Sequence, residues 1–75
     1  MTIERIHPQN DERAAWAAKA LAAFQEETGA DLPELVGDLL VDLMHWCDRN
    51  NYDFDTALFR ARDHYAAEVK GEEFG

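Results

Sequence analysis

The segment 32–50 constrains the fold most, because as a helix it would be apolar around most of its circumference. A surface helix of a globular protein carries one apolar stripe, and a helix that is apolar on several sides must be covered on several sides. The apolar residues of this segment are Leu32, Leu35, Val36, Leu39, Leu40, Val41, Leu43, Met44, Trp46 and Cys47. The sequence therefore predicts a central helix with neighbours on at least two sides.

The length of the chain limits how well such a helix can be covered. The chain has 75 residues, which we interpret as a single domain over 1–75. A domain of this size buries only about 60% of the surface of its unfolded chain. We therefore expect a homodimer that forms mainly through the second helix. The residues expected at the dimer interface are Leu39, Leu43, Met44, Trp46 and Phe59.

Start and stop signals divide the chain into three helices, at about 10–28, 32–50 and 54–70, after an extended leader over 1–9. The expected N-terminal caps are Asn10, Asp31 in a capping box with Glu34, and Asp53 or Asp55. The expected stops are Gly29, the pair Asn50 and Asn51, and Gly71. Because no strand or hairpin signal occurs, the predicted fold is an all-α, compact three-helix domain.

The two outer helices carry apolar residues at helical spacing, as expected of surfaces that pack on the second helix. On the first helix these residues are Trp16, Ala17, Ala20, Leu21 and Phe24. On the third helix they are Phe54, Leu58, Ala61, Tyr65 and Val69. Cys47 is the only cysteine, so the chain has no internal disulfide, and its place on the apolar helix predicts a small core residue.

The negative charge is concentrated around the second helix. Residues 26–55 hold nine acids against one base, Arg49, which makes −8 of the total formal charge of −9. The acids expected to form a binding surface are Glu27, Asp31, Glu34, Asp38, Asp42 and Asp48. Such a surface favours a basic protein as partner and disfavours direct binding to nucleic acid or to an anionic membrane. No apolar run approaches the roughly 20 residues of a membrane span, and we expect a cytoplasmic protein.

Side chains with catalytic or metal-binding chemistry are sparse. Asp38, Asp42 and His45 recur at i, i+4 and i+7, so they share one helix face and are the weak candidates for metal ligands. The same residues also supply the polar face that an apolar helix needs, and that is the interpretation we favour. Serine is absent, which excludes a Ser-His-Asp triad. We expect neither a cofactor nor a bound metal.

Part of the chain resembles the last helix pair of the all-α nucleoside triphosphate pyrophosphohydrolases of the MazG type. The residues that carry the resemblance are Val36–Leu40, Trp46–Asp55 and Ala57–Leu58. Those enzymes hold magnesium with an E-x-x-E pair and an E-x-x-D pair, and the resemblance implies that Asp38 would be a ligand. Glu34 precedes Asp38 by four residues instead of three, and Glu26 and Glu27 are adjacent where the family has E-x-x-E.

The chain also resembles small uncharacterised acidic proteins encoded on bacterial phages and integrative elements. The residues that carry this resemblance are Asp38–Arg49 and His64–Glu68. Proteins of that setting often inhibit host machinery, and an acidic surface can occupy a site built for a phosphate backbone.

Three functions are consistent with these features. The first is a non-enzymatic acidic protein-binding module, in its sharpest form a mobile-element inhibitor that mimics the charge of nucleic acid and blocks a basic host protein. The second is a magnesium-dependent nucleotide hydrolase of the MazG type. The third is a purely structural homodimer. The sequence favours the first, with a second copy and a basic protein as partners.

Overall fold

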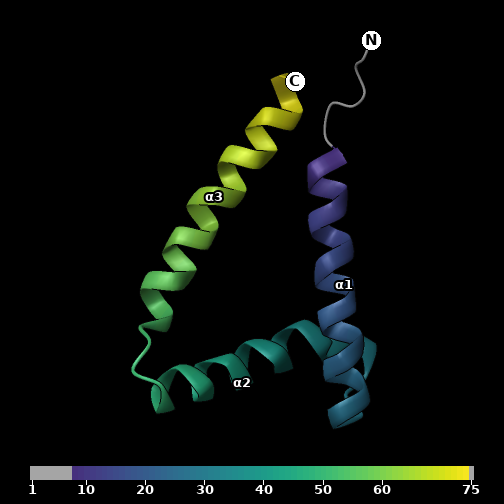
Figure 1. The fold of residues 1–75 in the computed structure, drawn as a ribbon, viewed down its shortest axis with the longest axis vertical. Helices are drawn as coiled ribbons and strands as arrows, with labels where there is room; N and C mark the ends of the chain where they lie inside the picture. Colours follow the sequence, from purple (N-terminus) through teal and green to yellow (C-terminus); the bar gives the residue numbers. More distant parts are fainter. Residues whose placement is uncertain (1–7, 75) are drawn as a thin grey trace.

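A computed structural model describes residues 8–74, and within them the chain forms three α-helices and no strand (Figure 1). The helices are α1 (Pro8–Thr28), α2 (Leu35–Arg49) and α3 (Phe54–Phe74), and the short 3-10 helix η2 (Leu32–Glu34) leads into α2. The predicted all-α fold with three helices is confirmed. Residues 1–7 of the expected leader lie outside the described part, and its last two residues, Pro8 and Gln9, belong to α1.

The three helices are the sides of an open triangle. In Figure 1, α2 forms the base, while α1 and α3 run antiparallel from its two ends toward an apex, where the N-terminal end of α1 approaches the C-terminal end of α3. At the apex the side-chain amide of Asn10 donates a hydrogen bond to the carbonyl oxygen of Glu68, at 3.2 Å. The molecule is flat, with extents of 46 × 27 × 18 Å.

Gly29 ends α1, as predicted. Its φ of +75° is a left-handed conformation that favours glycine, and its N–H donates to the carbonyl of Gln25 at 2.7 Å. The side chain of Gln25 then donates to the carbonyl of Ala30 at 3.1 Å. These contacts close the first corner of the triangle within six residues.

The predicted capping box at the start of the second helix is wrong. Asp31 has the extended backbone of an N-cap, but its carboxylate accepts no capping hydrogen bond. Its backbone carbonyl accepts the N–H of Glu34 instead, at 3.0 Å, because the chain enters α2 through one turn of 3-10 helix.

The second corner follows the expected turn chemistry. Asn51 has a φ of +59°, a conformation that asparagine tolerates, and the N–H of Tyr52 donates to the carbonyl of Cys47 at 3.0 Å. The rings of Trp46 and Tyr52 meet edge to face with their centroids 5.0 Å apart. Asp53 then caps α3 by accepting hydrogen bonds from the N–H and the hydroxyl of Thr56, at 3.2 and 2.8 Å.

Two helix ends differ from their predictions. Asn10 lies inside α1 and is therefore not its cap, because Pro8, which suits the first turn, already begins the helix. Gly71 does not end α3, which continues to Phe74. A glycine inside a helix costs only about 1 kcal/mol relative to alanine, so it weakens a helix without stopping it.

The prediction of a compact domain is wrong. The radius of gyration is 15.1 Å, whereas a compact chain of this length has one of about 11 Å. Within the described part, only Leu35 and Cys47 are buried, with 5% and 7% of their surface exposed. Both α1 and α3 contact α2, near its two ends (Figure 1), and most of the apolar side chains of α2 stay exposed.

The expected packing faces of the outer helices are mostly open as well. Leu21 and Phe24 on α1, and Phe54 and Val69 on α3, are half-buried. The remaining large members of those faces, Trp16, Leu58 and Tyr65, are exposed, Trp16 at 59%. The expectation that Cys47 is a core residue is confirmed, since it is buried and unpaired.

Candidate functional site

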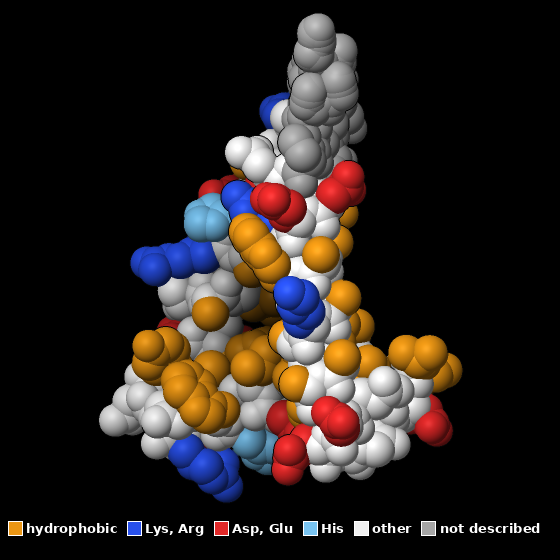
Figure 2. All heavy atoms as spheres, turned by 45° about the vertical axis from the view of Figure 1, so that its right-hand side comes forward, with side chains coloured by type: hydrophobic (Ala, Val, Ile, Leu, Met, Phe, Trp, Pro, Cys, Tyr) orange, Lys and Arg blue, Asp and Glu red, His pale blue; other side chains and the backbone are white. Residues whose placement is uncertain are grey.

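One uncovered feature of the second helix is a stripe of four apolar side chains. They recur at i, i+4, i+7 and i+8, so they lie on one face of α2. We name as the α2 stripe the residues Val36, Leu40, Leu43 and Met44, whose exposed fractions are 60%, 40%, 41% and 47%. Figure 2 shows apolar side chains lining the hollow between the helices and reaching the surface near the ends of α2.

The five residues expected at a dimer interface lie in different parts of the structure. Leu43 and Met44 belong to the α2 stripe, whereas Leu39 is half-buried within the chain. Trp46 is exposed and packs edge to face on Tyr52. Phe59 is exposed on α3, a different helix from the stripe. The expected set therefore does not form one patch on α2, and it omits two members of the stripe, Val36 and Leu40.

The six acids expected to form a binding surface are all exposed. Asp38 and Asp42 line a hollow of about 260 Å³ where the end of α1 crosses α2, and Val41 and Phe24 are among its apolar lining residues. Residues 26–42 of this corner contain six acids and no base. We name this region the acidic corner, with members Glu26, Glu27, Asp31, Glu34, Asp38 and Asp42. Asp48 lies at the opposite end of α2.

The weak metal candidates do not form a site. Among the described residues, no three His, Cys, Asp or Glu side chains gather closely enough to hold a metal ion. Asp38 and His45 share a helix face, but seven residues of helix separate them by about 10 Å along the axis. A ligand set needs its donor atoms within about 2.0–2.6 Å of one ion. Helical spacing alone is therefore not enough to show that these residues can bind one metal ion.

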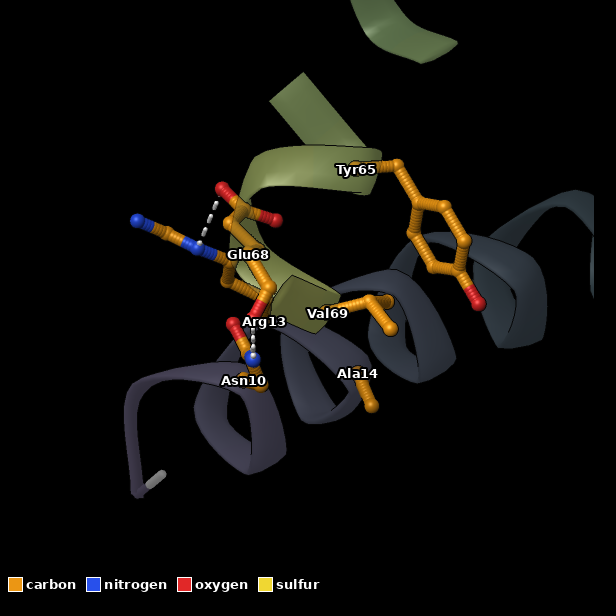
Figure 3. Close-up of a pocket in the computed structure, with 6 residues that line it drawn as sticks. All are labelled: Asn10, Arg13, Ala14, Tyr65, Glu68 and Val69. Carbon is orange, nitrogen blue, oxygen red and sulfur yellow. Dashed lines mark hydrogen bonds and ion pairs between the residues drawn. The ribbon is translucent and has the colours of Figure 1, made fainter. Parts of the chain in front are cut away.

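The apex holds a polar cluster that joins distant parts of the described chain, and no sequence pattern predicts it. Nε of Arg13 lies 3.2 Å from a carboxylate oxygen of Glu68, beside the hydrogen bond from Asn10 (Figure 3). These side chains, with Ala14, Tyr65 and Val69, line a hollow of about 340 Å³. A salt bridge between residues of opposite ends of the chain leaves no pattern in a single sequence, because neither partner has a fixed spacing from the other.

Asp53 is the titratable group whose environment most clearly favours its charged form. The hydroxyl and the backbone N–H of Thr56 both donate to its carboxylate and lower its pKa below the ordinary value of 3.8. The group is a helix cap on the surface, so this shift reflects structure and does not indicate catalysis.

No helix in the described range 8–74 combines the length and apolarity needed to cross a membrane. Searches of protein-family models, of curated proteins and of solved structures found no match to this chain. The functional conclusion therefore depends on the geometry of the chain itself.

Proposed function

We propose that this chain is a non-enzymatic acidic protein-binding module. One observation carries the proposal: the α2 stripe is exposed in a molecule whose described residues include only two buried side chains, Leu35 and Cys47. Contiguous apolar surface that is rimmed by polar residues marks protein interaction sites in soluble proteins, because leaving it in water costs free energy that association recovers.

The acidic corner supplies the electrostatic part of the proposal. Its six acids carry no base among them, so they create a negative potential beside the apolar surface. Such a potential raises the rate of association with a positively charged partner and disfavours acidic ones. The sharpest form of this function is an inhibitor that occupies the nucleic-acid site of a basic protein by charge mimicry.

The described residues give no support to the alternative of a magnesium-dependent hydrolase. Magnesium demands near-octahedral oxygen coordination, and catalytic sites usually supply at least one or two carboxylates together with substrate phosphates. Asp38 and Asp42 line an open hollow with apolar neighbours, and no third acidic, histidine or cysteine ligand joins them within the described range.

The proposal is tested by capture on immobilised protein from a lysate of the source organism, at low and at high salt. We expect the wild-type chain to retain a specific basic polypeptide at low salt and to release it as salt rises, because screening weakens surface attraction. The double variant Asp38→Asn/Asp42→Asn should retain less of it. The matched control Glu12→Gln/Asp63→Asn removes the same charge from exposed positions outside the acidic corner and should retain it as the wild type does.

Two results would contradict the proposal. One is that no polypeptide is retained at any salt concentration. The other is that the pure protein hydrolyses nucleoside triphosphates with magnesium and loses that activity in Asp38→Asn, which would favour the hydrolase alternative.

A further inference from the structure

We draw no further inference here: the strongest candidate, the exposed apolar stripe of Val36, Leu40, Leu43 and Met44 on α2, carries none, because nothing in the structure shows what covers it.

Discussion

The two corners of the triangle and its apex are held by different kinds of interaction. At the corners, the hydrogen bonds of Gly29, Tyr52 and Asp53 join residues at most five positions apart in the chain. At the apex, Asn10 and Glu68 are 58 residues apart, and the contact is polar and partly exposed. Local interactions therefore determine where each helix begins and ends, while the angle between α1 and α3 depends on a few long-range contacts. Comparing variants at the corners, in the core and at the apex tests this division.

The largest effect is expected in the small core beside the first corner. Leu35→Ala should lower the free energy of unfolding by about 2–5 kcal/mol, because it removes apolar contacts and leaves a cavity. The control Leu32→Ala makes the same change three residues earlier, at a side chain that is 74% exposed, and should cost less than about 1 kcal/mol. Urea denaturation at one fixed protein concentration measures both. Equal losses would show that Leu35 is not part of a core.

Glycine substitutions should have opposite signs at the corner and inside a helix. Gly29→Ala forces a β-carbon into a φ of +75° and should destabilise the chain by about 1 kcal/mol. Gly37→Ala lies within α2, where an added β-carbon meets nothing within 4 Å, and should stabilise by about 0.5–1 kcal/mol. Thermal unfolding followed by circular dichroism distinguishes them. A gain in stability from both Gly29→Ala and Gly37→Ala would mean that the backbone conformation of Gly29 does not fix the first corner.

These residues show which parts of the fold a sequence can specify. Gly29, Asn51 and Asp53 were recognisable because a left-handed backbone or a helix cap demands a particular residue type at one position. Helix start and stop signals of that kind recovered all three helices. The packing of the helices was harder to predict. Apolar spacing on α1 and α3 shows which face could be covered, but it carries no information on the angle at which the helices cross.

The candidate site was predictable in part for the same reason. The excess of apolar residues on α2 predicted more apolar surface than this chain can cover, and Leu43 and Met44, two of the residues expected at a dimer interface, are exposed. The dimer itself stays a prediction. The half-burial of Leu39 was not predictable, since it depends on how the neighbouring helices cross α2. Metal binding by Asp38, Asp42 and His45 requires distances in three dimensions, and a shared helix face does not supply them.

A smaller effect, which depends on pH, is expected at the second corner. The lowered pKa of Asp53 means that folding favours its carboxylate. Its contribution to stability is therefore fully present above the ordinary pKa of 3.8 and is lost as the pH falls through the lower, folded-state value. Asp53→Ala should be less stable than the wild type at about pH 6, and the difference should shrink at about pH 2.5.

The matched control for this change is Asp63→Ala, which removes an exposed carboxylate from the surface of α3. It should alter stability little at either pH. Chemical denaturation at both pH values measures the differences. A gap between the wild type and Asp53→Ala that stays constant with pH would show that the capping hydrogen bonds do not depend on the charge of Asp53.

The smallest effect on stability is expected at the apex. The Arg13 and Glu68 side chains are 47% and 36% exposed, so water and salt screen their attraction, and exposed pairs contribute about 0.2–1 kcal/mol. A double-mutant cycle with Arg13→Ala and Glu68→Ala should give a coupling energy in that range, which decreases as salt is added. The control cycle pairs Glu68→Ala with Arg60→Ala, an exposed arginine on the same helix two turns away, and should give no coupling. A salt-independent coupling above about 2 kcal/mol would mean that the apex is as firmly fixed as the corners, and the contrast between local and long-range parts of this fold would then be wrong.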